Sequence, residues 1–540
     1  MPDSPLIVEN LSFRYRDRQG AAIHNISFEA RPGEVLLIAG ASGCGKTTLI
    51  RCINGLIPRS YKGEISGRIT VFSEEVKDWP LSRISQKIGT VLQDPERQIL
   101  GTKVLNEVAF GLENLGMPRE EIHQRVRSAM DLLEISHLQD RETFTLSGGE
   151  KQKVALAGVI AMQPSILLLD EPLASLDPAS AWDSLNTIRL LANQGMTVLM
   201  VEHRIEDVLR IQPERVMFMS EGEIRYLGNL SGLSKVVNYR EVKLPAEDII
   251  QRAKEDPAPA KLSLLPSASD GGPRTDALVK FENVAFGYDE NEVLHGISLE
   301  IKRGDIIAVL GANGAGKTTF VKHAIGLLKP KAGHVFVNGQ DTRQLSVAEI
   351  AHTLGYVFQS PSHMLFAPTV REELSFGPQN LGHPKEVVEQ EVKEALRIVN
   401  LSDKEQDPPL ALSFGQQKRV SIAAILAMRS RILVMDEPTA GQDYQNYMNF
   451  MDSILQLPGF EAILFITHDV DLAVIFANRV LILNNGQLIA DGKPQDVLHD
   501  FDRLKANRLI PTSLLALNLK QLSKTGGFLR AEALAHVSYR

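Results

Sequence analysis

The sequence of 540 residues predicts an α/β protein made of two tandem copies of one domain, each with a mainly parallel sheet and a phosphate-binding loop. Three repeated stretches support this prediction. GASGCGKTT recurs as GANGAGKTT, LLLDEP recurs as LVMDEP, and VEH recurs as ITH. Corresponding residues lie 265 to 271 positions apart, and a nearly constant offset over more than 150 residues indicates a domain duplication.

The two copies have short apolar runs at matching places. Residues 35–39 and 306–310 end at a glycine and are predicted to be buried strands, and the residues after each Lys-Thr-Thr have helical spacing. Strand, glycine loop and helix are the context that a phosphate-binding loop requires. Residues 166–169 and 432–435 are predicted to be further buried strands, each ending in Asp-Glu-Pro. Alternating strands and helices imply a mainly parallel sheet in each copy.

The repeats divide the chain into predicted domains at 1–240 and 278–505. Between them, residues 241–277 are predicted to be a linker, most of it a tether of mixed stiffness, because Pro, Ser, Asp and Gly are frequent there. Residues 506–540 form a predicted tail, in which IPTSLLALNLKQL is expected to be a short amphipathic helix.

Composition excludes several classes of protein. There are 40 Gly and 27 Pro, which is ordinary globular usage and excludes collagen-like chains. Lys and Arg number 58 against 66 Asp and Glu, and this net charge of −8 argues against a nucleic-acid partner. The two cysteines, Cys44 and Cys52, provide neither a disulfide framework nor metal-ligand spacing, as expected in a reducing compartment.

Membrane-directed segments are also not expected. The start of the chain has no basic stretch followed by a long apolar run, so no secretory signal is predicted. The longest apolar stretches, such as residues 154–162, are far shorter than the roughly 20 residues of a membrane span. If the protein serves a membrane process, we expect it to dock onto another protein.

The glycine loops carry the predicted nucleotide chemistry. Glycines allow backbone N–H groups to approach phosphate oxygens, and the following helix start adds positive potential. Lys46 and Lys317 are expected to reach the β- and γ-phosphates of ATP, and Thr47 and Thr318 to offer hydroxyls to Mg²⁺. The predicted ATP-binding residues of the loops are Gly40, Ser42, Gly43, Gly45, Lys46, Thr47 and Thr48, and Gly311, Asn313, Gly314, Gly316, Lys317, Thr318 and Thr319.

Each Asp-Glu-Pro motif places two acidic residues at the end of a predicted strand. Asp170 and Asp436 are expected to hold Mg²⁺, and Glu171 and Glu437 to polarise an attacking water. The alternative is that Asp-Glu-Pro merely caps a strand. The recurrence of the pair 124 and 119 residues after the loop lysine favours the catalytic interpretation.

The segments LSGGE at 146–150 and LSFGQ at 412–416 each precede a predicted helix. Here the sequence resembles the ATP-binding-cassette (ABC) ATPases, whose signature is Leu-Ser-Gly-Gly-Gln, and the resemblance covers nearly the whole chain. It implies ATP hydrolysis with ATP and Mg²⁺. It also implies two tandem P-loop NTPase domains, each with a mainly parallel sheet core, an antiparallel β subdomain and an α-helical signature subdomain.

The resemblance assigns further roles by position in the motifs. The pairs are Tyr15 and Tyr288, which would stack on adenine; Gln93 and Gln359, which would sense Mg²⁺, the γ-phosphate and the membrane partner; Asp177 and Asp443, which would couple the two sites; and His203 and His468, which would contact the γ-phosphate.

The family works as a head-to-tail pair, which the resemblance implies and the spacing does not prove. One ATP would lie between Lys46 of the first copy and Ser413 and Gly415 of the second. The other would lie between Lys317 and the first copy's Ser147 and Gly149.

The copies differ at several motif positions. Phe414 replaces a signature glycine, Glu150 replaces the signature glutamine, and Gln442 precedes Asp443 where leucine is usual. Phe414 is harmless if its φ is negative, and otherwise crowds the first site. Because both glutamates and both histidines are intact, two hydrolytic sites of unequal rate are predicted. Cys44 lies in the first glycine loop, where a helix N-terminus favours a thiolate; the alternative is an inert small residue.

The segments after Gln93 and Gln359 resemble the ATPases of energy-coupling factor (ECF) transporters, which favour Gln-Asn-Pro-x-x-Gln, then Glu-Glu-Val-x-Phe-Gly and Asn-Leu-Gly. The first copy reads QDPERQ, NEVAFG and NLG; the second reads QSPSHM, EELSFG and NLG. Gln98 keeps the second glutamine of this pattern, and Met364 does not.

This second resemblance implies a motor at the cytoplasmic face of the membrane. Its partners would be a transmembrane coupling protein and a small substrate-binding membrane protein, and its cargo a vitamin, a vitamin precursor or a transition-metal ion. The alternatives are a soluble tandem ABC ATPase that acts on ribosomes, and the ATPase of another ABC importer class. The proline-rich linker without a basic run argues against the first, and the complete second glycine loop against a monosaccharide importer.

Overall fold

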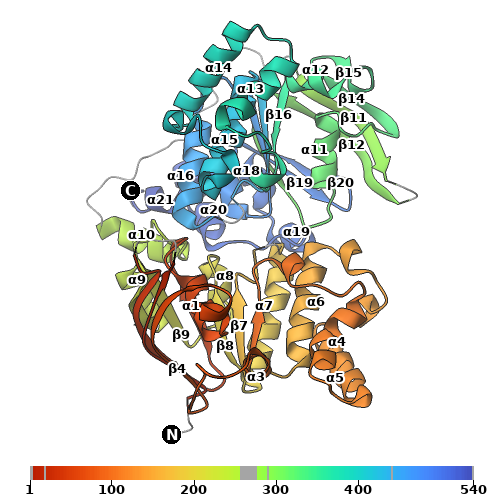
Figure 1. Ribbon diagram of the computed structural model, residues 1–540. Helices are drawn as coiled ribbons and strands as arrows, with labels where there is room; N and C mark the ends of the chain where they lie inside the picture. Colours follow the sequence, from red (N-terminus) through yellow and green to blue (C-terminus); the bar gives the residue numbers. More distant parts are fainter. Residues whose placement is uncertain are drawn as a thin grey trace. The chain divides into compact units, whose positions relative to one another are not determined.

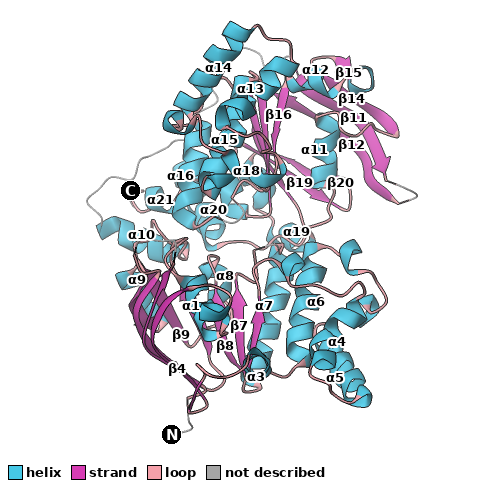
Figure 2. Cartoon of the chain, in the orientation of Figure 1, coloured by secondary structure: helices cyan, strands magenta, loops and turns pink. Residues whose placement is uncertain are grey.

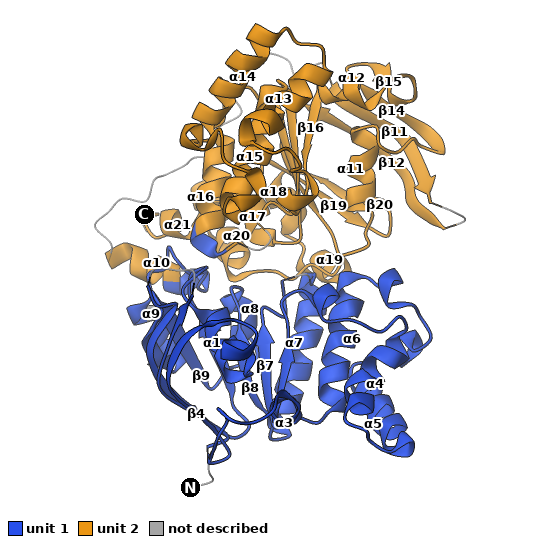
Figure 3. Ribbon diagram, in the orientation of Figure 1, with its two compact units in different colours: residues 1–248, 443–445 blue, residues 249–442, 446–540 orange. Residues whose placement is uncertain are grey.

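The computed structural model describes residues 4–16, 20–174, 176–255, 277–288, 291–439 and 442–537. The chain divides into two compact units, residues 1–248 with 443–445 and residues 249–442 with 446–540 (Figure 3). Most of the predicted tether, residues 256–276, lies outside the described residues. Among the described residues, no helix is both long and apolar enough to span a bilayer.

The first unit contains an antiparallel sheet and a mainly parallel sheet (Figure 2). In the parallel sheet all neighbouring strands are parallel except β9 and β10. In spatial order, the antiparallel sheet is β2 (Ile23–Ala30), β1 (Leu6–Tyr15), β4 (Gly63–Val71) and β5 (Glu74–Glu75), and the parallel sheet is β10 (Glu223–Gly228), β9 (Arg215–Ser220), β3 (Val35–Ala39), β8 (Thr197–Val201), β7 (Ile166–Asp170) and β6 (Ile88–Val91).

The second unit repeats this topology strand for strand, which confirms the predicted duplication. The antiparallel sheet is β12 (Glu292–Lys302), β11 (Ala277–Gly287), β14 (Ala332–Val337) and β15 (Gln340–Asp341), and the mainly parallel sheet is β16 (Leu354–Val357), β17 (Ile432–Asp436), β18 (Ala462–Thr467), β13 (Ile306–Leu310), β19 (Arg479–Asn484) and β20 (Gln487–Gly492). The predicted strands at 35–39 and 306–310 are β3 and β13, which are continuously buried, as parallel strands covered on both faces should be.

Helices surround the sheets in each unit (Figure 1). Those of the first unit are α1 (Lys46–Ile53), α2 (Leu56–Arg59), α3 (Leu81–Lys87), α4 (Val104–Asn114), α5 (Arg119–Leu132), α6 (Gly148–Ala161), α7 (Pro178–Asn193), α8 (Ile205–Leu209) and α9 (Leu230–Val236); α10 (Ala246–Glu255) follows along the chain. Those of the second are α11 (Lys317–Ala324), α12 (Val347–Ala351), α13 (Val370–Asn380), α14 (Lys385–Ile398), α15 (Phe414–Ala427), α16 (Tyr444–Leu455), α17 (Val470–Phe476), α18 (Pro494–Leu498), α19 (Phe501–Ala506), α20 (Ser513–Thr525) and α21 (Ala531–Leu534).

Each unit builds its core from the two sheets and the helix after the glycine loop. In the first unit, apolar side chains of β1, β2, α1 and the parallel sheet form one buried cluster, and the second unit has the matching cluster. A separate cluster lies among α13, α14 and α15. These layers confirm the predicted fold class, with a parallel core, an antiparallel subdomain and a helical subdomain.

The C-terminal segment packs within the second unit. Helix α20 occupies the stretch in which an amphipathic helix is predicted. The buried amide of Asn518 exchanges hydrogen bonds with the backbone of Leu529 at 2.7 and 2.9 Å. The guanidinium of Arg530 pairs with the carboxylate of Asp452 on α16, with one contact at 3.0 Å.

Candidate nucleotide-hydrolysis site

The parallel register brings the predicted motifs of each unit to one sheet edge. In the first unit β8 lies between β3 and β7, so the carboxyl ends of these three strands are neighbours. The glycine loop follows β3, Asp170 ends β7, and His203 lies just beyond β8. The second unit has the same arrangement of β13, β18 and β17. Crevices at the carboxyl ends of such strands are where α/β sheets bind ligands.

The glycine loops have a backbone that only glycine adopts readily. Gly40, Gly43 and Gly45 have φ of 150°, 81° and 106°, and their counterparts in the second copy have 158°, 79° and 96°. A Cβ at Gly40 would lie 2.2 Å from the carbonyl oxygen of Met219. Helix α1 starts directly after the loop without a side-chain cap, which leaves its first N–H groups suited to an anion.

Each loop lysine is buried against its own loop. The ammonium of Lys46 donates to the carbonyls of Gly40 and Ala41 at 2.8 and 2.9 Å. In the second unit Lys317 makes the same pair of contacts at the same distances. The positive charge is therefore held at the loop in both copies.

The loop threonines and strand-end aspartates meet as predicted. The hydroxyl of Thr47 lies 3.3 Å from the carboxylate of Asp170, and that of Thr318 lies 3.1 Å from Asp436. Burial is the main cause that raises the pKa of both aspartates, and the neighbouring glutamate raises it further. A hydroxyl and a dry carboxylate are oxygen ligands of the kind that Mg²⁺ prefers.

A cation at this place would share its ligands with a nucleotide. No group of three or more His, Cys, Asp or Glu side chains among the described residues could hold a metal by itself. The donor set fits Mg²⁺ bound through one or two protein oxygens together with phosphate oxygens. In the second unit the hydroxyl of Tyr356 also donates to Asp436, at 2.8 Å.

The two predicted catalytic glutamates share an unusual backbone. Glu171 and Glu437 have φ of 52° and 43°, the left-handed region that side-chain-bearing residues rarely adopt. The N–H of Glu171 donates to the carbonyl of Val201 on β8 at 2.9 Å, and that of Glu437 donates to the carbonyl of Ile466 on β18 at 3.0 Å. Backbone strain of this kind concentrates at functional sites, and here it recurs at matching positions of both copies.

In the first unit two predicted residues, Gln93 and His203, contact the carboxylate of a third, Glu171. Glu171 accepts a hydrogen bond from the amide of Gln93 at 2.6 Å and lies 3.0 Å from Nε2 of His203. Burial raises the pKa of Glu171, but the hydrogen bond and charge of His203, with Lys46 and Gln93, outweigh it, so the pKa lies below the usual value. The carboxylate is thus ionised and able to accept a proton.

The second unit keeps the histidine contact but not the glutamine contact. Nδ1 of His468 lies 3.0 Å from Glu437. Burial again raises the pKa of Glu437, and His468 and Lys317 reverse the shift, leaving the pKa lowered. Gln359 is exposed and forms no such bond to Glu437 in the described part of the chain.

The two tyrosines assigned to adenine lie beside the helix that follows each glycine loop. The hydroxyl of Tyr15 is 3.2 Å from Thr48, and that of Tyr288 is 3.5 Å from Thr319. Tyr288 is 55 % exposed, whereas Tyr15 is half-buried. Their predicted role in stacking remains a prediction.

The signature serines begin the helices α6 and α15. Ser147 and Ser413 are N-cap residues, and each forms a reciprocal capping box with the residue three positions later. Glu150 forms this bond in the first copy just as Gln416 does in the second. Partial burial raises the pKa of Glu150, but its bonds to Ser147 and the charge of Arg141 outweigh burial and leave the pKa lowered. Phe414 is the first helical residue and does not have a positive φ, so its backbone is unstrained.

The coupling aspartates occupy helix starts, and the signature glycines lie near the start of each signature helix. Asp177 is the buried N-cap of α7 and accepts from the N–H and hydroxyl of Ser180, both at 3.0 Å. Asp443, also buried, directly precedes α16. Gly149 is half-buried and Gly415 is exposed.

The structure does not support a reactive thiol at Cys44. The side chain is buried, and burial raises the pKa of the thiol although Lys46 opposes the shift. Its sulfur lies 3.9 Å from the ammonium of Lys46. The inert interpretation of this cysteine is therefore the better one.

Sequence reasoning missed three buried carboxylates near the sites. Glu202 accepts from the N–H groups of Leu173 and His203 at 2.7 and 3.0 Å, and burial raises its pKa to about 7. No repeat indicated it, because threonine stands at the matching position 467. Glu107 and Glu373 hold loops, as described below, and their recurrence in NEVAFG and EELSFG was the signal.

A glycine loop after a central strand, a hydroxyl and carboxylate for a cation, and a strained glutamate beside a histidine define a P-loop nucleotide hydrolase. The family model described as ABC transporter matches residues 23–174 and 294–440, one match in each unit. The chain therefore belongs to the ABC transporter family, as an ATP-binding subunit with ATPase activity.

Relatives of similar length carry the same description. An ABC transporter ATP-binding protein of Caldanaerobacter subterraneus subsp. tengcongensis is 36 % identical over 576 residues, with all of both chains covered. One of Methanosarcina acetivorans is 35 % identical, over 95 % of this chain and 90 % of that one. A solved structure of cbiO1 from Clostridium perfringens, part of the ABC transporter complex cbiONQ, is 31 % identical over 43 % of this chain and 94 % of its own, with a TM-score of 0.40.

Proposed function

We propose that this chain is the ATP-hydrolysing motor of an ECF-type importer at the cytoplasmic face of the membrane. It would work with a transmembrane coupling protein and a small substrate-binding membrane protein, and its cargo would be a vitamin, a vitamin precursor or a transition-metal ion. The observation that carries the proposal is a matched apolar surface in each unit, formed by the segment that follows Gln93 or Gln359.

A buried glutamate shapes this surface in both copies. Glu373 accepts from the N–H groups of Phe366 and Ala367, both at 2.8 Å. Glu107 accepts from those of Leu100 and Gly101 at 2.8 and 2.6 Å. The carboxylate accepts from two consecutive N–H groups, and the side chain of the first of these two residues points outward. Phe366 is 62 % exposed and Leu100 is 69 % exposed.

The Phe-Gly pair of the motif completes the surface. A Cβ at Gly377 would lie 2.5 Å from the side chain of Met428, and one at Gly111 would lie 2.7 Å from Met162. The glycine lets α13 approach α15, and α4 approach α6, while the adjacent phenylalanine stays outside. Phe376 is half exposed and meets Phe366 edge to face, with ring centroids 4.8 Å apart.

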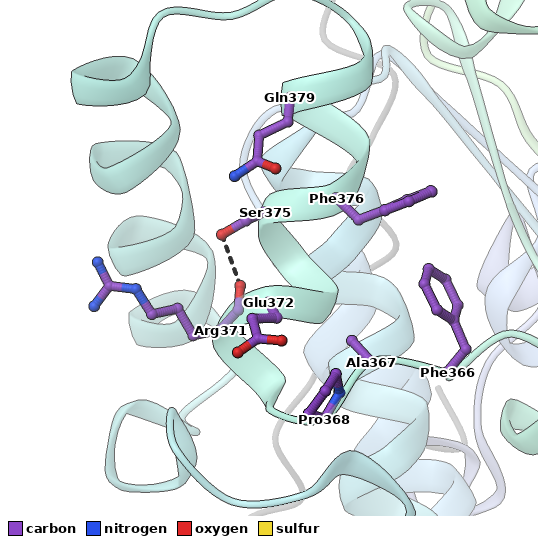
Figure 4. A pocket seen from close by; sticks show the side chains of 8 residues that line it. All are labelled: Phe366, Ala367, Pro368, Arg371, Glu372, Ser375, Phe376 and Gln379. Atoms are coloured by element: carbon purple, nitrogen blue, oxygen red, sulfur yellow. Dashed lines mark hydrogen bonds between the residues drawn. The ribbon is translucent and has the colours of Figure 1, made fainter.

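In the second unit α13 and the loop before it line a pocket of about 410 Å³, with Phe366 and Phe376 on one side of α13 and Arg371 and Ser375 on the other (Figure 4). The lining residues are Phe366, Ala367, Pro368, Arg371, Glu372, Ser375, Phe376 and Gln379. Exposed apolar side chains that gather in one patch, as Phe366 and Phe376 do, are typical of protein docking sites.

The ECF assignment rests on the sequence pattern around Gln98. Its side chain accepts from the N–H of Leu92 at 2.8 Å and donates to the carbonyl of Thr90 at 3.2 Å. It thereby closes the loop that carries Gln93. Met364 instead packs against the apolar cluster of the helical subdomain, so the second copy holds this loop differently.

At each site the residues of this chain have separable tasks in the proposed cycle. Lys46 and Lys317 would hold phosphate charge, Glu171 and Glu437 would accept a proton from the attacking water, and the paired histidines would keep those carboxylates ionised. Mg²⁺, held by Thr47, Asp170 and Gln93 or by Thr318, Asp436 and Gln359, would offset charge on the phosphates. Ser413 and Gly415 would complete the first site, and Ser147 and Gly149 the second.

Co-purification from native membranes tests the proposal. The full-length protein, captured from detergent-solubilised membranes, should bring two small hydrophobic membrane proteins with it, identified by mass spectrometry. Phe376→Asp should reduce their recovery at least fivefold. ATP hydrolysis by the isolated chain should stay within twofold, because Phe376 lies on the exposed surface of α13 and is not one of the groups that contact Glu437. Recovery of ribosomal RNA and ribosomal proteins in their place would contradict the proposal.

A further inference from the structure

A lysine is fully buried in the signature helix of the second unit. Lys418 on α15 is 1 % exposed, which is rare for a residue with a charged side chain. Its ammonium donates to the backbone carbonyl of Pro438 at 2.5 Å. Pro438 directly follows Glu437, so the lysine is bonded to the peptide unit next to the strained glutamate.

Two aromatic rings surround the same ammonium. It lies 5.1 Å from the ring centroid of Phe414 at the start of α15, and 5.8 Å from that of Phe450 on α16. Both distances are within the range of cation–π attraction. Burial lowers the pKa of Lys418 to about 7, against the opposing charge of Glu437. The rings and the carbonyl therefore offset part of the cost of burying this group.

The first copy has neither the ring nor the lysine. Gly148 occupies the position of Phe414, and the buried Gln152 that of Lys418. The unusual phenylalanine in the second signature thus comes together with the lysine that it contacts.

The loop after the glutamate is held differently in the first unit. There Glu202 accepts from the N–H of Leu173, and Arg204 donates to the carbonyls of Leu173 and Leu176, both at 3.2 Å. Both residues lie beside His203. The corresponding residues of the second copy are Thr467 and Asp469, and the carboxylate of Asp469 cannot replace the guanidinium of Arg204 as a donor to loop carbonyls.

We propose that Lys418 is a positioning residue that ties the signature helix of the second unit to the loop of Glu437, with Phe414 holding the lysine in place. Glu437 is then fixed on both sides. Its own N–H donates to the carbonyl of Ile466 on β18, and the carbonyl of the following Pro438 accepts from Lys418. A shift of α15 would move this carbonyl, so Glu437 responds to the signature helix of its own unit, whereas the loop after Glu171 is held by the residues beside His203. The inference does not depend on the class of transporter.

ATP hydrolysis by the full-length protein tests the inference. Lys418→Met removes the donor at similar volume and should lower kcat about fivefold with KM for ATP within twofold, because binding residues are untouched. Lys418→Gln, which replaces the ammonium by an amide donor and matches the residue type of the first copy, should recover at least half of kcat. Gln152→Met is the matched control in the first unit and should leave kcat within a factor of 1.5.

A double-mutant comparison covers the case in which Lys418→Met does not fold. Phe414→Leu should lower kcat two- to threefold when residue 418 is lysine and have no effect in the Lys418→Gln background, because the ring acts on the cation. Equal effects of Phe414→Leu in both backgrounds would overturn the inference. So would an unchanged kcat in folded Lys418→Met, or a loss that appears in KM alone.

Discussion

At the scale of single residues, the left-handed backbone of Glu171 and Glu437 is the feature that most sharply marks the reaction centre. Each residue directly follows a buried strand, and its N–H remains bonded to the neighbouring strand, so the chain turns abruptly at the glutamate. A strained residue of this kind costs about 1–3 kcal/mol. Its presence in both copies is understandable if the turn aims the carboxylate at the histidine and the glycine loop.

The buried lysine makes stability depend on pH. Because the folded-state pKa of Lys418 is lowered to about 7 from 10.5, the unfolded chain binds more protons between these values. Stability of the second unit should therefore rise from pH 7 to about 10.5 relative to a chain without this lysine, and the penalty should be constant below pH 7.

Thermal unfolding of the wild type and Lys418→Met across this range measures the effect. The Tm of the wild type should gain several degrees on that of the variant as pH rises, since each pKa unit corresponds to about 1.4 kcal/mol. A difference in Tm that stays constant with pH would show that the pKa of Lys418 is the same in the folded and the unfolded chain.

At the scale of elements, glycines decide how the helical subdomains pack. Gly111 and Gly377 lie on α4 and α13, where a Cβ would meet the methionine at the end of the signature helix. The side chains next to them, Phe110 and Phe376, are partly exposed. The same dipeptide therefore sets the distance between two helices and the composition of the proposed docking surface.

Adding one methyl group to this contact should be costly. Gly377→Ala would place Cβ 2.5 Å from Cγ and Sδ of Met428, and overpacking of this kind costs about 1–3 kcal/mol. We expect a lower Tm for this variant and weaker capture of membrane partners. Gly527→Ala is the matched control, because its Cβ would meet nothing within 4 Å. Equal Tm values for the two variants would contradict the packing argument.

At the scale of the whole molecule, the two copies share topology but differ in the groups around each glutamate. The carboxylate of Glu171 contacts Gln93 and His203, while in the described part of the chain the carboxylate of Glu437 is bonded to His468 and not to Gln359. In the second unit Tyr356 also bonds to the strand-end aspartate, whereas Thr90 stands at the matching position of the first unit. Duplication has preserved the parts that the chemistry requires and has let the surrounding contacts diverge.

Separate replacement of the two glutamates should reveal this asymmetry. Glu171→Gln and Glu437→Gln each remove a proton acceptor at nearly constant size and should each lower ATP turnover at saturating Mg-ATP, by unequal factors. Equilibrium binding of ATP should persist in both variants, which controls for folding. If one replacement left turnover unchanged, the corresponding site would be non-catalytic.

The sequence alone determined the duplication, the glycine loops and the strands that precede them. These features are local: a glycine needed for a positive φ, or a run of five apolar residues, has the same consequence wherever the rest of the chain lies. Strands 35–39 and 306–310 were therefore placed correctly.

Only the tertiary structure determined which side chains meet across the sheet edge and which are buried away from solvent. The burial of Lys418, the bonds of Glu202 and the raised pKa of Cys44 arise from segments that are distant in the sequence, and no local pattern contains them. Desolvation depends on everything packed around a group, whereas helix and strand formation depend mostly on neighbours along the chain. The motifs and their departures at Phe414, Glu150 and Gln442 could be identified in the sequence, but the buried contacts that distinguish the two sites could not.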